Sequence, residues 1–313
     1  MALLRNAGLL RPFLAVARTG NLSAAARELS VSQPALTKSV RKLERQCGIA
    51  LFQRRARGMT LTPSGVALLA HARQIEAQCR VADDELDALA RGAAGRIRVG
   101  AGPYWGSTVV PRAIARLHER LPGLDVGLDV GVNSVVMPRL FAGELDLVIG
   151  ALPDIGALPP GIERRDFLRI ELRVVAGRHH PLHARRRVTV TDLAEFPWVL
   201  YQHDRDVMDH LAQILQRGGA APPRIRVETT SLLAVIQLLR TGPYLACMAD
   251  ALLRAAPEPD IAIVPYPRGV WTFPSGALFH TAVRDFAPIR TLLELVSREA
   301  SAASERGGRR RTR

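Results

Sequence analysis

Cysteine is scarce in this chain, and long apolar runs are missing. Three cysteines, Cys47, Cys79 and Cys247, lie far apart, and none belongs to a CxxC pair or to a Cys/His spacing typical of a metal site. This excludes a disulfide framework and favours a reducing cytosolic compartment. No run approaches the ~18 apolar residues of a transmembrane helix. Arg5 and Arg11 interrupt the stretch before a signal-peptidase-like AVA at 15–17, so we expect no cleaved leader.

Acidic residues are nearly missing from the first quarter of the chain. Residues 1–75 hold twelve Lys and Arg against Glu28 and Glu44, a net charge of +10, whereas residues 96–303 hold 24 Arg against 21 acids. The whole chain carries +14, which favours a polyanionic partner, either nucleic acid or an acidic membrane surface. The last ten residues, SERGGRRRTR, predict a disordered basic tail over 304–313.

Signatures of common enzyme families are also absent. The sequence contains no GxxxxGK[ST], GxSxG or HExxH motif. GAGPYWG at 100–106 has one residue too many for a dinucleotide site, and HHPLH at 179–183 fits no standard metal site. We therefore expect no enzymatic activity, no cofactor and no bound metal. Cys247, within the apolar segment YLACM, is expected to be a buried hydrophobic side chain rather than a redox switch.

The N-terminal quarter contains a pattern of short helices. The first has apolar residues at helical spacing and ends at TGN, 19–21: Leu9, Leu10, Phe13, Leu14 and Ala17. Ser23 can cap a second helix over 24–29, and SVS at 30–32 forms a short turn. Ser32 can cap a third helix, whose first turn tolerates Pro34. Two helices around a three-residue turn predict a helix-turn-helix.

The third helix has one apolar and one basic face. The apolar stripe follows i, i+4, i+7 and i+11: Leu36, Val40, Leu43 and Cys47. The basic residues on its outer side are Lys38, Arg41, Lys42 and Arg45. Side chains near its start can reach base edges in the major groove. The candidate DNA contacts are Ser32, Gln33, Pro34, Thr37, Lys38 and Arg41. The alternative is a solvated basic surface helix.

A basic hairpin follows this helix. LFQRRARGMTLTPSG, 51–65, predicts strand, turn and strand, with Gly58 at the turn and Arg54, Arg55 and Arg57 near its tip. A basic hairpin beside a helix-turn-helix is typical of a wing that contacts phosphates or the minor groove.

These segments together resemble a known family. FLAVARTGNLSAAARELSVSQPALTKSVRKLERQCGIALFQRRARGMTLTPSG is similar to the winged helix-turn-helix of LysR-type transcriptional regulators, continuously over about 9–65. LTPSG stands where many members have LTEAG, and Pro63 suits a helix start. The layout of the remaining chain extends the resemblance to about 9–300.

A long helix over 64–91 is expected to link the N-terminal module to the rest. Its apolar residues are spaced 4, 3, 4, 3, 4, 3: Leu68, Ala72, Ile75, Cys79, Ala82, Leu86 and Leu89. This heptad seam favours dimerisation, and the alternative is a single packed helix. The resemblance implies antiparallel pairing and a homodimer or homotetramer. RGAAG at 91–95 then predicts a hinge.

Residues 96–303 alternate apolar strands with helical patterns, which predicts an α/β domain with largely parallel strands. The resemblance implies a two-lobed, periplasmic-binding-protein-like effector domain with crossovers near 165–170 and 264–270. The full prediction is a winged helix-turn-helix over 1–63, a linker helix and hinge over 64–95, and the effector domain over 96–303. Lobe I takes about 96–167 and 268–303, and lobe II about 168–267.

Candidate effector contacts lie where strands end and helices begin. Such loops present free N–H groups at the carboxyl ends of strands, where ligands of open α/β sheets bind. Mapped onto the family pattern, they are Tyr104, Asn133, Ser134, Tyr201, Gln202 and Thr229. The alternative for each is a loop side chain that only caps a helix. Because GPYWGST and VNS contain no acid, we expect an anionic small-molecule effector.

The leading interpretation is a bacterial DNA-binding transcriptional regulator, cytoplasmic and nucleoid-associated, that responds to a small molecule. Its expected partners are double-stranded operator DNA, the effector and further copies of the chain, with RNA polymerase as a further candidate and no membrane. The alternative is a soluble solute-binding receptor. That class has no use for a net charge of +10 in residues 1–75.

Overall fold

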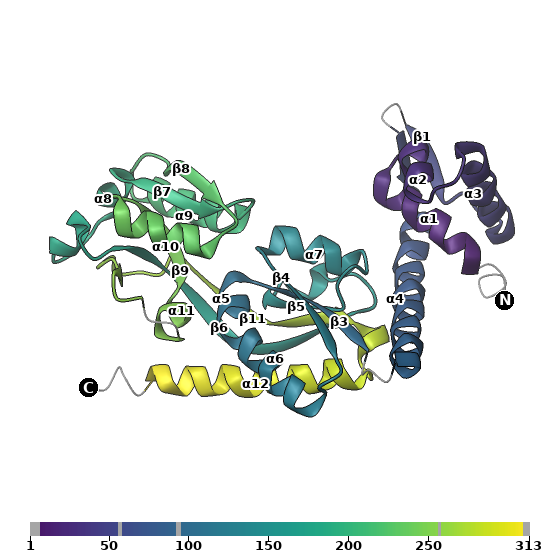
Figure 1. The fold of residues 1–313 in the computed structure, drawn as a ribbon. Coiled ribbons are helices and arrows are strands. Elements are labelled where there is room, and N and C mark those ends of the chain that lie inside the picture. Colours follow the sequence, from purple (N-terminus) through teal and green to yellow (C-terminus); the bar gives the residue numbers. More distant parts are fainter. Residues whose placement is uncertain (1–6, 56–57, 92–94, 256–257, 309–313) are drawn as a thin grey trace.

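The computed structural model describes residues 7–55, 58–91, 95–255 and 258–308. A small helical module stands at one end of the long helix α4, and a larger two-lobed α/β domain extends from the side of that helix (Figure 1). The predicted fold class, an α/β chain with a winged helix-turn-helix, a linker helix and a two-lobed domain, is confirmed. No helix among the described residues is long and apolar enough to cross a membrane.

The helix-turn-helix forms as its sequence pattern predicts, with one different cap. Its helices are α1 (Ala7–Thr19), α2 (Leu22–Glu28) and α3 (Gln33–Cys47). Ser32 caps α3, as predicted. The cap of α2 is Asn21, not Ser23, because the Asn21 side chain accepts hydrogen bonds from the backbone N–H of Ser23 and Ala24 at 2.8 and 3.1 Å. The Ser23 hydroxyl instead donates to Gln33 Oε1 at 3.0 Å and ties α2 to α3.

The apolar stripe of α3 faces the core of this module. Leu36, Val40 and Leu43 are buried among side chains of α1, α2 and the start of α4, whereas Cys47 is half-buried. Burial of one apolar side chain contributes about 1.5–3 kcal/mol, so this stripe fixes which face of α3 remains outside.

The predicted hairpin consists of β1 (Phe52–Arg55) and β2 (Gly58–Leu61), paired antiparallel. Glu44 on α3 holds its first strand, since Oε1 accepts from the N–H of Leu51 and Phe52 at 2.9 and 3.1 Å. The N–H of Met59 donates to the carbonyl of Gly20 at 2.8 Å. The hairpin is therefore fixed to α3 and to the α1–α2 loop.

Helix α4 (Pro63–Arg91) matches the predicted linker helix, but one part of its apolar seam is buried and another part is exposed. Leu68 and Ala72 are buried in the core of the helix-turn-helix module. Further along, Ile75 and Leu86 are 36% and 65% exposed, and Cys79 is exposed too. Only the second part of the seam is therefore free to contact another chain.

The opposite side of α4 packs on the larger domain. Gln74 Nε2 donates to Thr281 Oγ1 at 3.1 Å, and Arg80 forms an ion pair of 2.8 Å with Asp146. Asp146 is only 3% exposed, and it also accepts from the backbone N–H of Arg98 at 2.7 Å. These polar contacts attach the linker helix to lobe I.

The larger domain contains one mixed sheet in the order β4-β3-β5-β11-β6-β9-β7-β8, with β10 paired to β6. Its strands are β3 (Arg96–Ala101), β4 (Asp125–Val130), β5 (Leu147–Ala151), β6 (Ile162–Gly177), β7 (Pro197–Tyr201), β8 (Arg224–Thr229), β9 (Leu245–Ala249), β10 (Ile261–Ile263) and β11 (Trp271–His280). Its α-helices are α5 (Pro103–Ser107), α6 (Val109–Arg120), α7 (Asn133–Phe141), α8 (Val190–Ala194), α9 (Arg205–Arg217), α10 (Leu232–Thr241), α11 (Asp250–Ala255) and α12 (Ala287–Gly308). Short 3-10 helices are η2 (Ile155–Ala157), η3 (Pro181–Ala184) and η4 (Thr281–Val283).

The expected parallel pairing holds inside each lobe but not between them. β3 pairs parallel with β4 and β5, and β7 pairs parallel with β8 and β9, whereas β6 and β11 are antiparallel to their neighbours. The first crossover strand, β6, includes the predicted 165–170. The second, β11, begins only at Trp271, so the prediction of 264–270 was wrong. In this stretch Pro265 and Pro267 have no N–H to donate, and the N–H groups of Val264 and Val270 donate to the carbonyls of Val174 and Leu172, so it forms the approach to β11 beside β6.

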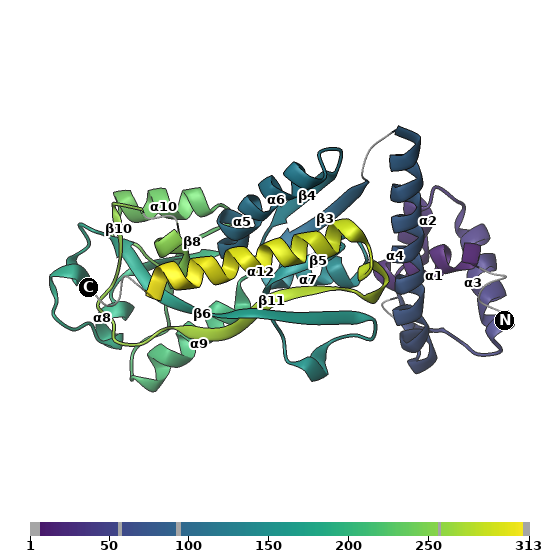
Figure 2. The same cartoon turned by 90° about the horizontal axis from the view of Figure 1, so that it is seen from below.

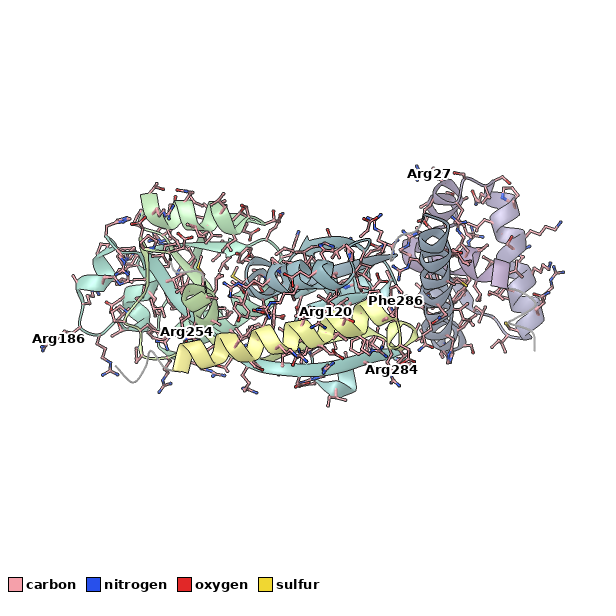
Figure 3. The ribbon with its side chains drawn as sticks, turned by 60° about the horizontal axis from the view of Figure 1, so that its bottom comes forward. Arg27, Arg120, Arg186, Arg254, Arg284 and Phe286 are labelled. Carbon is pink, nitrogen blue, oxygen red and sulfur yellow. The ribbon has the colours of Figure 1, made fainter. Side chains whose placement is uncertain are left out.

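Helix α12 lies along lobe I beside α6 (Figure 2). It continues to Gly308, past residue 304, where a disordered tail was predicted to begin, and residues 309–313 lie outside the described residues. Arginines are spread over the whole length of the molecule: Arg27 lies on the N-terminal module, and Arg186 near the far end of lobe II (Figure 3).

Candidate functional site

The exposed face of α3 forms a groove opposite its buried stripe. The groove brings together most of the candidate DNA contacts and two further residues of α3: Gln33, Pro34, Thr37, Lys38, Arg41, Glu44 and Arg45. Lys38 and Arg41 are exposed, and neither forms an ion pair within the described part of the chain. Two free cations one helical turn apart, next to polar side chains, can bind phosphates and base edges.

Ser32 and Glu44 have structural roles in this surface. The Ser32 hydroxyl accepts from the N–H of Ala35 at 3.3 Å, which caps α3, and Glu44 holds the hairpin. Glu44 therefore does not neutralise Lys38 or Arg41 by an ion pair. On the hairpin, Arg54 and Arg55 are exposed, and Arg57 lies outside the described residues.

A second candidate site is a cavity of about 100 Å³ between the two lobes. Lobe I contributes the start of α5, the start of α7 and the end of β5, and lobe II contributes the start of α9, the end of β9 and α11. The crossover strands β6 and β11 form its floor. The cavity thus lies where a movement of one lobe against the other changes its shape.

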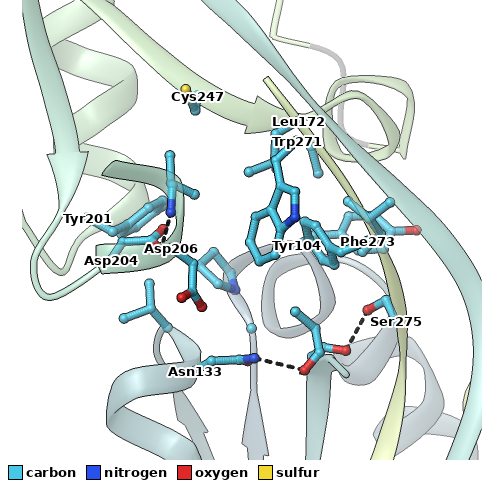
Figure 4. A pocket seen from close by; sticks show the side chains of 18 of the residues that line it. Tyr104, Asn133, Leu172, Tyr201, Asp204, Asp206, Cys247, Trp271, Phe273 and Ser275 are labelled. Carbon is cyan, nitrogen blue, oxygen red and sulfur yellow. Dashed lines mark hydrogen bonds between the residues drawn. The ribbon is translucent and has the colours of Figure 1, made fainter. Parts of the chain in front are cut away.

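Aromatic side chains form much of the cavity wall (Figure 4). Tyr104 comes from α5, Tyr201 from the end of β7, and Trp271 and Phe273 from β11. The ring centroids of Trp271 and Phe273 are 4.2 Å apart, and Tyr104 meets Trp105 edge-on at 5.3 Å. Tyr104 and Tyr201 were predicted from the sequence, whereas Trp271 and Phe273 were missed.

Polar groups on the lobe I side are already partnered. Asn133 Nδ2 donates to the carbonyl of Ala151 at 2.8 Å. The Ser275 hydroxyl accepts from Trp105 Nε1 at 2.7 Å and donates to the carbonyl of Gly150 at 2.6 Å. These bonds hold the lobe I wall rigid.

The lobe II side carries two carboxylates, and this contradicts the reasoning for an anionic effector. Asp204 and Asp206 line the cavity, and its described lining contains no Lys, Arg or His. Burial raises the pKa of Asp204 to about 6. Burial, and then the charge of Asp204, raises the pKa of Tyr201 above its ordinary value. The expectation of an anionic effector considered only the loops of lobe I. The acids come from the loop YQHDRDV of lobe II.

The other predicted effector contacts lie outside the cavity lining. The hydroxyl of Ser134 donates to the carbonyl oxygen of His203 across the lobes at 2.6 Å. The Gln202 side chain is exposed, and its N–H donates to the carbonyl of Thr229 at 3.0 Å. Thr229 Oγ1 accepts from the N–H of Ser231 at 3.1 Å. Each of the three has an observed role in loop or lobe geometry.

The HHPLH segment forms a turn. The Nδ1 of His180 accepts from the N–H of Leu182 at 3.2 Å, and its ring packs on Phe196 at 4.4 Å. Burial lowers the pKa of His180 and of His183. Among the described residues there is no cluster of side chains suited to a metal ion. Cys247 is buried in β9, as predicted, and burial raises the pKa of its thiol.

Comparisons with known proteins match both parts of the chain. Bacterial regulatory helix-turn-helix proteins of the lysR family match residues 8–66, and the LysR substrate binding domain matches residues 90–301. The HTH-type transcriptional regulator PcaQ of Agrobacterium fabrum is 29% identical over 296 residues, covering 93% of this chain and 94% of PcaQ. The SDS degradation transcriptional activation protein of a Pseudomonas species is 33% identical over 214 residues, covering 67% of this chain and 69% of that protein.

Solved structures show the same fold. A full-length OxyR variant from Pseudomonas aeruginosa matches with a TM-score of 0.60 at 21% identity, covering 93% of this chain and 94% of that one. CbnR, a LysR family transcriptional regulator, matches with a TM-score of 0.54 at 24% identity, covering 94% and 99%. With both family domains matched in order, the chain belongs to the LysR-type transcriptional regulators, DNA-binding proteins with an effector-binding domain that are not enzymes.

Proposed function

We propose that the exposed face of α3 reads operator DNA and that the interlobe cavity binds the effector. Gln33, Thr37, Lys38 and Arg41 contact the major groove, and Arg54 of the hairpin contacts phosphates. The observation that carries this proposal is the pair of unpartnered cations, Lys38 and Arg41, directly opposite a buried apolar stripe within the part of the chain that the structure describes. Such a helix can enter a groove of DNA without losing any of its own core contacts.

We also propose that the protein acts as a homodimer or homotetramer on nucleoid DNA in the cytoplasm. The exposed part of the α4 seam supports pairing, because Ile75 and Leu86 would bury apolar surface against a second chain. Paired chains place two copies of α3 on two half-sites of one operator. The boundaries 1–63, 64–95 and 96–303 describe the parts that move relative to one another.

Effector binding changes the activity by favouring one arrangement of the lobes. The cavity is lined from both lobes, so a ligand binds more tightly to the arrangement in which both walls contact it. The contacts of α4 with lobe I, from Gln74 and Arg80, transmit this change toward the DNA-binding module.

The test is genome-wide mapping of bound sites, followed by affinity measurements on a recovered duplex. We expect the full-length protein to protect a site with two half-sites, and Arg41→Ala to weaken binding. Arg120→Ala removes an exposed arginine of α6 in the effector domain and serves as the control. Equal affinity of the wild type and Arg41→Ala would contradict the role of α3.

A further inference from the structure

The lining of the interlobe cavity contains two carboxylates, Asp204 and Asp206, and no cationic side chain among the described residues. Neither Asp204 nor Asp206 forms an ion pair within the described ranges of the chain. Arg205, between the two acids in the chain, is exposed and is not part of the lining, while Arg254 pairs with Asp250 and Arg112 donates to the carbonyl of Ala255 at 3.3 Å. A ligand in this cavity therefore meets carboxylates without a compensating protein cation among the described lining residues.

The two carboxylates enter the cavity from the same helix start. Asp204 caps α9, but its hydrogen bond from the N–H of Val207 is long, at 3.5 Å. Asp206 lies in the first turn of α9, and Figure 4 shows it and Asn133 approaching the cavity from α9 and α7. Burial raises the pKa of Asp204 to about 6 although the N–H of Val207 lowers it, so its charged form has fewer stabilising partners than it has in water. A positive group beside it would supply one.

The aromatic walls suit the same kind of ligand. Trp271 and Phe273 cover the floor, and Tyr104 closes one side. Aromatic faces attract cations as well as apolar rings, with the strongest attraction at a Trp. The cavity of about 100 Å³ is several times the roughly 10–15 Å³ that a single bound water requires, so it has room for a small ligand.

One buried polar atom is left for a ligand. The hydroxyl of Tyr201 has no solvent exposure and no hydrogen-bond partner among the residues that the structure describes. A buried hydroxyl without a partner loses the hydrogen bonds that water gives it in the unfolded chain, and a bound donor restores one. A ligand N–H near Asp204 can donate to this oxygen once a small movement of the lobes or of the ring exposes it.

We propose that the cavity binds a small aromatic primary amine, whose ammonium group lies between Asp204, Asp206 and the Tyr201 hydroxyl. Its ring packs on Trp271 and Phe273. The ammonium provides donors for all three oxygen-bearing groups, whereas a carboxylate ligand would meet two like charges and an alcohol would leave the charge of Asp204 unbalanced. This inference rests on the proposed role of the cavity as the effector site.

The test uses three probes of nearly the same shape on the full-length protein: benzylamine, benzyl alcohol and benzoate. Calorimetry and thermal shift at about pH 8, above the pKa of Asp204, should show binding of benzylamine, weaker binding of benzyl alcohol and none of benzoate. Asp204→Asn and Asp206→Asn should each reduce benzylamine affinity by about tenfold or more, and Asp209→Asn, an exposed acid of α9 outside the lining, should leave it unchanged.

Asn is a good helix cap, and Asp206 is exposed, so at least one of the two variants should fold. Binding of benzoate in place of benzylamine overturns the charge assignment but leaves the cavity as an effector site. Benzylamine affinity that is unchanged in both variants, or no binding of any probe, overturns the amine proposal. DNA affinity of the Arg41→Ala variant, measured separately, tests the proposed function without reference to these outcomes.

Discussion

The hydroxyl of Ser134, in the first turn of α7, donates a hydrogen bond of 2.6 Å to the carbonyl oxygen of His203. Ser134 belongs to lobe I and His203 to lobe II, so this bond joins the lobes directly at the rim of the cavity. His203 adopts a φ of +66°, a left-handed conformation that costs a residue with a side chain roughly 1–2 kcal/mol. His203, which accepts the hydrogen bond between the lobes, is therefore also the residue in the strained conformation.

Ser134→Ala should weaken this closure. Loss of one hydrogen bond removes about 0.5–1.5 kcal/mol, and the loop over 201–205 should then exchange its backbone hydrogens faster. Hydrogen exchange followed by mass spectrometry measures this. Ser301→Ala, at an exposed position of α12, should leave exchange in the loop unchanged. If both variants exchange alike, the contact does not control closure.

Lys38→Ala and Arg41→Ala should each weaken operator binding without lowering stability. Both side chains are exposed and lie away from the buried Leu36, Val40 and Leu43. A base-reading pair contributes about 1–3 kcal/mol, and loss of a phosphate contact reduces the dependence of affinity on salt. Fluorescence anisotropy at several salt concentrations, with urea unfolding as the folding control, distinguishes the two roles.

Ile75→Asp should weaken self-association. Ile75 is 36% exposed in the single chain, so the substitution spares the core but places a charge in the free part of the α4 seam. Sedimentation velocity at micromolar concentration should show a shift toward monomer. Ile155→Asp, at an isoleucine of η2 that is 75% exposed, is the matched control. A wild type that is monomeric under these conditions would contradict the proposal that this seam pairs two chains.

Asp204→Asn should stabilise the protein at neutral pH. The folded state raises the pKa of Asp204 to about 6, so the folded state retains a proton that the unfolded state, with its ordinary pKa near 3.9, has released. Stability therefore falls as the pH rises from about 4 to about 6. The free energy of unfolding of the variant should exceed that of the wild type by on the order of 1–3 kcal/mol at pH 7, and the two should be almost equal below pH 4. Urea unfolding across this range measures the difference, and a gain that is independent of pH would refute the cause.

The DNA-binding module could be predicted almost completely because its signals are local. The spacing of Leu36, Val40 and Leu43 fixes the buried face of α3, and Ser32 three residues before Ala35 fixes its start. The sequence pattern predicts Ser23 as the cap of α2, but Asn21 is an equally suitable cap residue, so the sequence alone could not decide between them. Only the fold shows that Ser23 bonds to Gln33.

The cavity could be predicted only in part because its walls come from distant segments. Tyr104 and Tyr201 follow strands and were found from the strand–loop–helix pattern. Asp206 and Trp271 line the same cavity although they lie far apart in the sequence, and Trp271 reaches it through the antiparallel pairing of β11 with β6, which no local pattern reveals. In the linker, Leu68 continued the heptad spacing although it packs inside its own chain. Periodicity identifies an apolar face but not the surface that covers it.

The pairing of β6 with β11 also restricts how the effector domain can respond. The two strands are hydrogen-bonded side by side from Trp271 against Leu172 to His280 against Ile162, with a single irregularity at Ser275 and Gly276. Such a ladder resists stretching and sliding but can twist about its length. We therefore expect the lobes at its two ends to move mainly by rotation about the ribbon axis. Under the proposed function, an effector changes the resting angle of that rotation, and the linker helix then receives a change in orientation rather than a change in distance.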